Sequence, residues 1–102
     1  MTEFVKVAST DDIPKGGMKG FGMNGKKFLV ANVGGKFYAM ESTCTHAKGP
    51  LANGTLSGKE VTCPWHGSKF DVTTGKVTGA PARKDELTYE VKVQGKDLLV
   101  KL

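Results

Sequence analysis

The chain has 102 residues, of which 38% are hydrophobic and 25% are charged, and its formal net charge is +5 at pH 7. This length fits one folded domain, which we expect to span residues 1–102. The basic residues are dispersed lysines with Arg83 as the single arginine, so no basic block is present and we expect no binding to nucleic acid.

The N-terminal residues, beginning Met1-Thr2-Glu3-Phe4, contain no long apolar run. A secretory signal needs roughly 7–15 consecutive apolar residues, and a membrane-spanning helix needs about 20. We therefore expect a cytoplasmic protein without membrane contact. In that reducing compartment Cys44 and Cys63 should not form a disulfide.

Strand patterns dominate the two ends of the chain. Gly34-Gly35 predicts a hairpin, because both residues can adopt positive φ. Gln94-Gly95 predicts a second turn near the C-terminus, and Asp11 to Pro14 a short helical turn. The predicted strands are 4–8, 27–33, 36–40, 87–93 and 98–102. The expected fold is therefore an antiparallel β domain.

The middle of the chain, residues 41–81, is rich in glycine, threonine and proline and shows little strand pattern. Such a long connection is unusual in a compact domain unless something organises it. Both cysteines and both histidines of the chain lie in this segment. We therefore expect a metal site to organise it.

These four residues form two short motifs, Cys44-Thr45-His46 and Cys63-Pro64-Trp65-His66, with sixteen residues between His46 and Cys63. Two thiolates and two imidazoles can bind a structural zinc ion or an iron–sulfur cluster. Ligand chemistry alone leaves both possibilities open.

The wider sequence resembles the Rieske family of [2Fe–2S] proteins. Cys44-Thr45-His46 is the usual form of the first family motif, and the second continues from Cys63 through Gly67-Ser68-Lys69-Phe70-Asp71. Family-like residues between the motifs are Leu51, Gly54 and Leu56. Gly79-Ala80-Pro81-Ala82 is similar to the proline-containing loop that covers the cluster in the family.

The resemblance implies an all-β, Rieske-type antiparallel β-sandwich with a small cluster-binding subdomain of loops at about residues 41–81. It implies one [2Fe–2S] cluster per chain, with Cys44 and Cys63 on one iron and His46 and His66 on the other.

Three further residues are implied to lie around the cluster. Ser68 is placed like the serine that donates to a cluster sulfide, although serine also commonly caps its own turn. Pro81 is expected to shield the cluster. Trp65 would either pack over the cluster loop or lie exposed at a docking surface.

The reduction potential is expected in the lower part of the Rieske range of roughly −150 to +300 mV. High-potential members have a tyrosine where this chain has Phe70, and a disulfide-bonded cysteine pair where it has Gly49 and Trp65. Phenylalanine cannot donate the hydrogen bond that the tyrosine supplies, so only Ser68 is left to raise the potential.

The function implied is that of a soluble one-electron carrier, a ferredoxin that is not itself an enzyme. Its partners would be a flavin-dependent reductase and an oxygenase or other terminal redox enzyme. Alternatives are a small Rieske subunit of a larger oxidoreductase such as a nitrite reductase, and a structural zinc-binding module. A membrane-anchored respiratory subunit has no support, because the sequence contains neither a membrane-spanning stretch nor a second cysteine pair.

Overall fold

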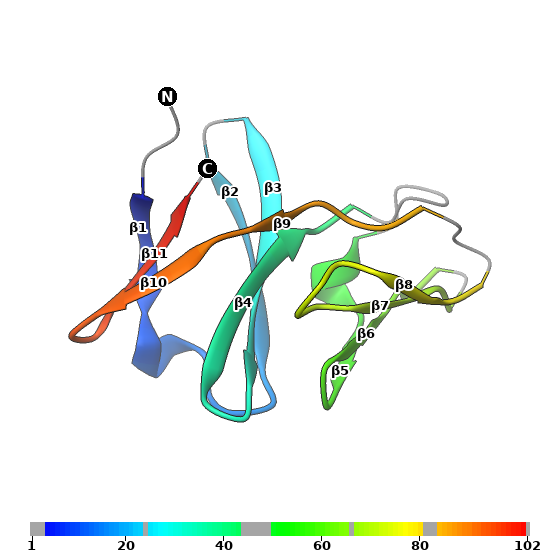
Figure 1. Ribbon diagram of the computed structural model, residues 1–102, viewed down its shortest axis with the longest axis horizontal. Helices are drawn as coiled ribbons and strands as arrows, with labels where there is room; N and C mark the ends of the chain where they lie inside the picture. The colour runs from blue at the N-terminus through cyan, green and yellow to red at the C-terminus, as the bar shows by residue number, and fades with distance from the viewer. Residues whose placement is uncertain (1–3, 24, 44–49, 66, 81–83, 102) are drawn as a thin grey trace.

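The computed structural model describes residues 4–23, 25–43, 50–65, 67–80 and 84–101, and these form three antiparallel sheets (Figure 1). The terminal sheet has the order β1-β11-β10, comprising Phe4–Ser9, Asp97–Lys101 and Val91–Gln94. The central sheet has the order β2-β3-β4-β9, comprising Met18–Met23, Lys26–Val33, Lys36–Glu41 and Thr88–Tyr89. The loop-bearing sheet has the order β5-β6-β7-β8, comprising Thr55–Ser57, Glu60–Thr62, Lys69–Asp71 and Val77–Gly79. Short 3-10 turns lie at Thr10–Asp12 and Leu51–Asn53.

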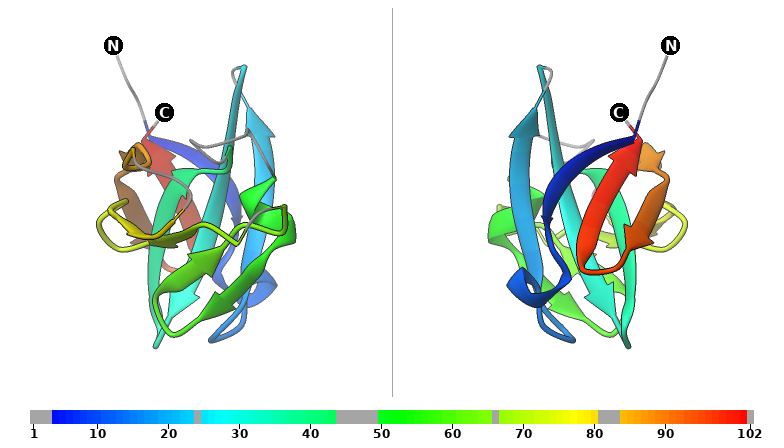
Figure 2. Two further views of the ribbon diagram at one scale, coloured as in Figure 1. Left: turned by 90° about the vertical axis from the view of Figure 1, so that its right-hand side faces the viewer. Right: turned by 90° about the vertical axis from the view of Figure 1, so that its left-hand side faces the viewer.

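The central sheet is covered on both faces, with the loop-bearing sheet on one side and the terminal sheet on the other (Figure 2). Five consecutive residues of β3, Phe28 to Asn32, are buried. Because side chains alternate along a strand, Phe28 and Val30 enter the core under the terminal sheet, whereas Leu29 and Ala31 enter the core under the loop-bearing sheet. The buried run of β3 therefore links the two cores.

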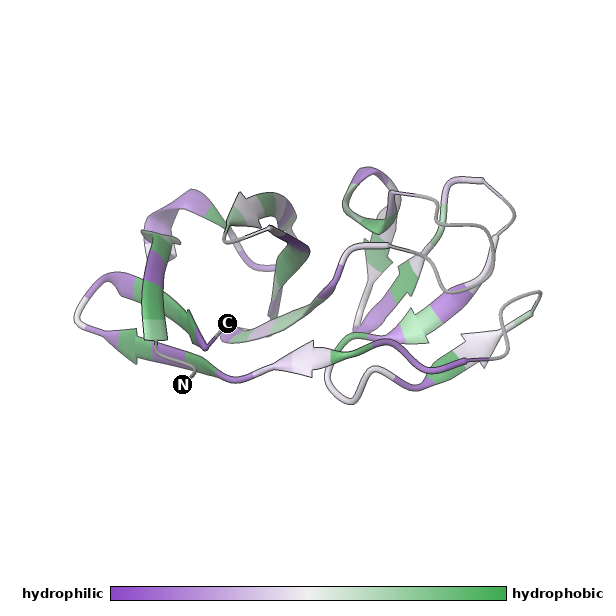
Figure 3. Cartoon of the chain, turned by 90° about the horizontal axis from the view of Figure 1, so that it is seen from above, coloured by the Kyte–Doolittle hydropathy of each residue, from purple (hydrophilic) through white to green (hydrophobic). Residues whose placement is uncertain are grey.

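The strands near the chain ends are packed on one face only, and polar and apolar residues alternate along them (Figure 3). In β11, Leu98 and Val100 are buried with Phe28 and Val30 of the central sheet. This alternation is the pattern from which the terminal strands were predicted, and they form close to the expected positions.

The hairpin prediction at Gly34-Gly35 is confirmed. Val33 pairs with Lys36, and the two glycines between them have φ values of 62° and 99°. The short helical turn also forms, but it begins at Thr10 and not at Asp11. The expected antiparallel β architecture is thus confirmed.

The single strand predicted at 87–93 is wrong, because two strands in different sheets occupy this segment. Tyr89 pairs with Ala39 of the central sheet, whereas Val91 pairs with Val100 of the terminal sheet. The crossing occurs at Glu90, whose carbonyl oxygen accepts a hydrogen bond from Lys101 N at 2.9 Å. Unbroken alternation does not reveal such a change of partner.

Five strands lie in segments that gave no strand prediction. One is β2, and the others are the four three-residue strands of the loop-bearing sheet in the segment 41–81. The loops of this segment therefore stand on a sheet of their own. No helix among the described residues is long and apolar enough to cross a membrane. That residues 1–102 form one domain stays a prediction.

Candidate metal centre

The first predicted ligand loop leaves the central sheet just after β4 and returns at the same place. Leu51 N donates a 2.7 Å hydrogen bond to Ser42 O, and Thr43 forms an isolated antiparallel bridge with Pro50. These contacts fix both ends of the connection 44–49. The predicted ligands Cys44 and His46 lie between them, outside the described residues.

The second predicted ligand loop joins β6 to β7 in the loop-bearing sheet and closes on itself. Cys63 N donates to Ser68 O at 2.7 Å, and Gly67 N donates to Cys63 O at 3.2 Å. Gly67 has a φ of 77°, a conformation that suits glycine at this tight return. The predicted ligand His66 lies within this loop, outside the described residues.

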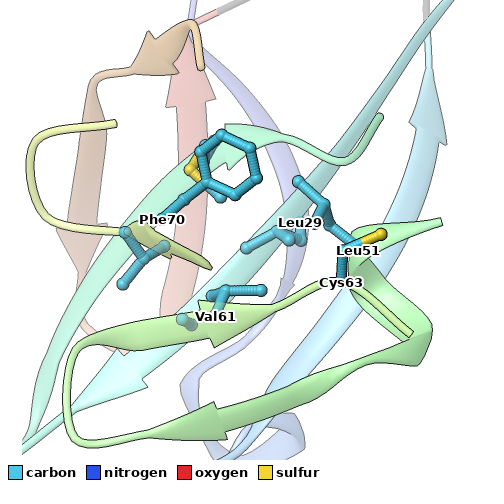
Figure 4. Close-up of a cluster of buried hydrophobic side chains, with 8 residues drawn as sticks. Leu29, Leu51, Val61, Cys63 and Phe70 are labelled. Carbon is cyan, nitrogen blue, oxygen red and sulfur yellow. The ribbon is translucent and has the colours of Figure 1, made fainter. Parts of the chain in front are cut away.

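Cys63 is the predicted ligand that the structure describes, and it lies at the edge of a hydrophobic core. Its thiol is free and the residue is only 2% exposed. It packs in one core with Leu51, Val61 and Phe70, and Figure 4 shows Leu51 beside it. Because Leu51 also closes the first loop, the bases of the two predicted ligand loops lie together.

Ser68 and Trp65 have opposite environments in the second loop. Ser68 is fully buried. Trp65 is 57% exposed. That it packs over the cluster loop, or that it lies at a docking surface, stays a prediction. The remaining predicted residue, Pro81, lies outside the described residues.

The segment Asp85 to Leu87, of which the sequence analysis singled out only Leu87 as the start of a strand, connects the loop-bearing sheet to the central sheet. Glu86 N donates to Gly75 O at 2.7 Å, and the Asp85 carboxylate accepts from Val77 N at 2.9 Å. Leu87 O accepts from Glu41 N at 2.8 Å. This strap therefore holds the residues that follow the proline-containing loop.

A second missed feature is the turn after β7, which Asp71 organises. Its carboxylate accepts hydrogen bonds from Thr73 N at 2.9 Å and Thr73 Oγ1 at 2.6 Å, and it pairs with Lys59 Nζ at 3.4 Å. Burial alone would raise the pKa of Asp71, but these donors outweigh it and the pKa is lowered. The Asp71 and Thr73 pair is a recognisable Asx turn in the sequence.

The described residues fit a thiolate-bound metal centre. The Cys63 thiol is free, buried and placed in a backbone loop that hydrogen bonds hold closed. Such a site keeps water from a sulfur ligand, and soft thiolates favour iron–sulfur clusters and zinc. The other three predicted ligands, Cys44, His46 and His66, lie outside the described residues, so the complete ligand set stays a prediction.

Similarity to known proteins distinguishes an iron–sulfur cluster from zinc. The sequence profile of the Rieske [2Fe–2S] domain matches residues 3–100. A curated relative is the ferredoxin component of the naphthalene 1,2-dioxygenase/salicylate 5-hydroxylase systems of a Ralstonia species, 38% identical over 97% of this chain and 95% of that protein. Another is the ferredoxin component of biphenyl 2,3-dioxygenase from Rhodococcus jostii, 41% identical over 95% of this chain and 91% of that protein. A similar solved chain belongs to a complex of reduced oxygenase and oxidised ferredoxin in carbazole 1,9a-dioxygenase, with a TM-score of 0.92, 34% identity and coverage of 96% and 92%.

Proposed function

The chain belongs to the Rieske [2Fe–2S] domain family, and from this premise we propose that Cys44, His46, Cys63 and His66 bind its cluster. Each of the two loops supplies one thiolate and one imidazole. The two cysteines bind one iron and the two histidines bind the other, as in the family. The buried Cys63 thiol beside the base of the first loop is the observation that supports this assignment.

The chain carries one [2Fe–2S] cluster and serves as a one-electron carrier. When bound, the oxidised cluster with two thiolates and two neutral imidazoles has no net charge, so it accepts an electron more readily than an all-cysteine dianion. The residues of the chain adjust this chemistry. Cys63 is kept from water, and the buried Ser68 hydroxyl is proposed to donate toward a cluster sulfide.

We propose that the chain passes electrons from a flavin-dependent reductase to an oxygenase or other terminal redox enzyme, and is not itself the enzyme. Relatives that match over nine tenths of their length are named as ferredoxin components of naphthalene and biphenyl dioxygenase systems. This support favours a carrier over a nitrite reductase subunit and over a zinc module. We also propose that it works in the cytoplasm.

The exposed Trp65 gives this proposal a place for docking. It projects from the same loop as Cys63 and His66, so a partner that covers it would lie next to the proposed ligands. Aromatic residues are common among the few that dominate binding energy at interfaces. The net charge of +5 would attract partners with acidic surfaces, and this attraction weakens as salt rises.

Co-purification from the source cell tests the proposal. Tagged holoprotein should capture a flavin-dependent reductase and an oxygenase at low salt, and both should elute as salt is raised. Reduced nicotinamide cofactor and the captured reductase should bleach the visible absorption of the carrier by reducing it. The captured oxygenase, supplied with oxygen, should restore the absorption by re-oxidising the carrier. If the chain is instead recovered at a fixed ratio with one large oxidoreductase, and high salt does not separate the two, the chain is a subunit of that enzyme.

A further inference from the structure

The sandwich of terminal and central sheets is open along one side, where a groove of about 470 Å³ lies between β4 and β10. Gly35 to Tyr38 line one side of it, and Val91 and Val93 line the other. Val93 is 48% exposed although it lies on the same face of β10 as the packed Val91. Apolar surface is therefore left accessible in this groove.

The β4 edge of the groove carries backbone groups without a strand partner. Asn32 directs its N–H and C=O to Gly17 and Gly16, so its opposite residue Phe37 directs its own N–H and C=O away from β3. If the register in which Ala39 pairs with Tyr89 continued, Val91 would lie opposite Phe37. Val91 instead pairs with Val100 in the terminal sheet. Among the described residues, no strand pairs with this edge of β4 beyond Ala39.

The β10 edge of the groove is open in the same way. β10 is the last strand of its sheet. Gln94 and Glu90 direct backbone groups toward β11, and the Glu90 carbonyl oxygen accepts a hydrogen bond from Lys101 N. The alternating antiparallel pattern then turns the N–H and C=O groups of Val91 and Val93 away from β11. Open edges of this kind pair readily with another extended chain.

Among the residues that line the groove the charged one is a lysine, and the nearest carboxylate along the chain, that of Glu90, pairs with Lys101 Nζ at 3.9 Å. Lys36 lines it, and the Lys15 side chain lies beside Gly35, 3.7 Å from where a Cβ on that glycine would be. The residues that line the groove include no carboxylate. An occupant with acidic side chains would therefore complement the groove, and the +5 net charge of the whole chain would also attract it.

We propose that this groove binds an extended segment of a partner protein, in which apolar residues alternate with acidic ones. The segment adds as a strand along β10, hydrogen bonding to Val91 and Val93. Its apolar side chains lie against Phe37 and Val93, and its carboxylates lie near Lys36 and Lys15. A second copy of this chain is a poor occupant, because it would bring its own positive charge to the same place.

The groove and the proposed cluster loops lie at opposite ends of β4. The first loop leaves after Thr43, whereas Phe37 lies next to the Gly34-Gly35 turn (Figure 1). The four residue steps from Phe37 to Glu41 alone span about 13 Å. If the proposed electron carrier function holds, a partner bound here leaves the cluster face free. It also raises the local concentration of the carrier near that partner's redox site.

Nuclear magnetic resonance of the 15N-labelled, oxidised holoprotein tests the groove directly. The probe is a synthetic heptapeptide of alternating glutamate and valine, and its counterpart has lysine in place of glutamate. The acidic peptide should shift the amide signals of Phe37, Val91 and Val93, and its affinity should fall as salt rises. The lysine peptide should bind at least about tenfold more weakly.

Two pairs of variants separate backbone pairing from charge. Val93→Pro removes an edge N–H that the ladder to β11 does not use, so the fold should remain and peptide binding should be lost, whereas Val93→Ala should retain binding. Lys36→Glu should weaken binding about tenfold, and Lys27→Glu, an exposed change at the other end of β3, should not. Binding of the peptide is independent of electron transfer, so this result and the proposed function can fail separately.

Three results would overturn the proposal. The first is the absence of shifts at these three amides at millimolar acidic peptide. The second is equal binding of the acidic and lysine peptides, which would remove the charge argument. The third is sedimentation of the holoprotein as a dimer that Val93→Pro converts to a monomer, because the occupant would then be a second copy.

Discussion

Cys63 belongs both to a hydrophobic core and to the proposed ligand set. Its neighbours Leu51, Val61 and Phe70 are fully buried, so the thiol lies where water is excluded. An uncharged oxidised cluster suits such an environment better than a dianion would, because charge is costly at low dielectric. Both the packing of the core and the proposed ligand role therefore favour a Cys63 side chain that is buried away from water.

Ser68 is proposed to adjust the reduction potential. The wild-type midpoint should lie in the lower part of the Rieske range, and Ser68→Ala should lower it further by about 60–130 mV. This shift corresponds to the roughly 1.5–3 kcal/mol of a hydrogen bond to a charged group, at about 59 mV per tenfold change for one electron. Protein-film voltammetry measures it, with the exposed Ser57→Ala as control. An unchanged midpoint in Ser68→Ala would leave Ser68 as a turn residue only.

Tyr89 gives the protein a pH dependence on the alkaline side. Burial, followed by the nearby Glu41 and Glu86 carboxylates, raises the pKa of Tyr89 above its ordinary value of 10.0. The unfolded chain therefore ionises this phenol first as the pH rises past 10. The stability that the neutral phenol provides is present below pH 10 and is lost as the pH rises through the folded-state pKa.

Tyr89→Phe tests this effect, because it retains the ring that packs edge-on to Phe28 at 6.0 Å. Urea unfolding of both holoproteins should show that the wild type loses more free energy of unfolding than the variant between pH 8 and pH 11. Curves that stay parallel over this range would mean that Tyr89 does not titrate differently in the two states.

At the scale of elements, Gly75 joins the β7–β8 turn to the strap at Asp85 to Leu87. Its φ is 79°, its oxygen accepts from Glu86 N, and a Cβ would overlap the Glu86 carbonyl oxygen. Gly58 has a similar φ of 60° but open space around it. The two glycines therefore separate backbone strain from close packing.

Alanine substitution at both glycines tests the strap. Gly58→Ala should cost about 1–2 kcal/mol of unfolding free energy from the left-handed backbone alone. Gly75→Ala should cost about 1–3 kcal/mol more, because the added methyl group forces the strap away. Chemical denaturation of the holoproteins measures both values. Equal losses would show that the strap moves freely with the turn.

The contrast between predicted and missed elements follows from how each strand is stabilised. Strands 4–9 and 97–101 are long enough for alternation to show, whereas each strand of the loop-bearing sheet has three residues. β2 contains Gly20 and Gly22, which lower strand propensity. Gly20 is needed because a Cβ there would lie 2.7 Å from the Ala52 Cβ, a tertiary requirement that no local pattern reveals.

The proposed site divides in the same way. The spacing of Cys44, His46, Cys63 and His66 indicated the ligand chemistry, because a Rieske cluster needs cysteine and histidine ligands. The strap gave no comparable signal, and the Asp71 turn gave only the short Asp71 and Thr73 pattern of an Asx turn. The strap contacts at Glu86 and Leu87 are backbone hydrogen bonds, which almost any residue can provide.

At the scale of the whole molecule, the proposed docking depends on the exposed Trp65 and on the net charge of +5. Trp65→Ala should slow electron transfer to the captured oxygenase about tenfold or more, because a central aromatic contact contributes about 2 kcal/mol or more. Phe4→Ala, which changes a 36% exposed aromatic residue in the terminal sheet, should have little effect. Stopped-flow reoxidation of the reduced carrier measures both rates. Equal slowing by the two variants would place docking elsewhere.

The central claim is that two histidine nitrogens and two cysteine sulfurs bind one binuclear iron cluster. Pulsed electron paramagnetic resonance of the reduced holoprotein, prepared with 15N-labelled histidine, tests it most directly. His46 and His66 are the only histidines of the chain, so the account predicts hyperfine coupling to two labelled imidazoles. A reduced cluster without histidine coupling, or a colourless protein that contains zinc, would contradict it.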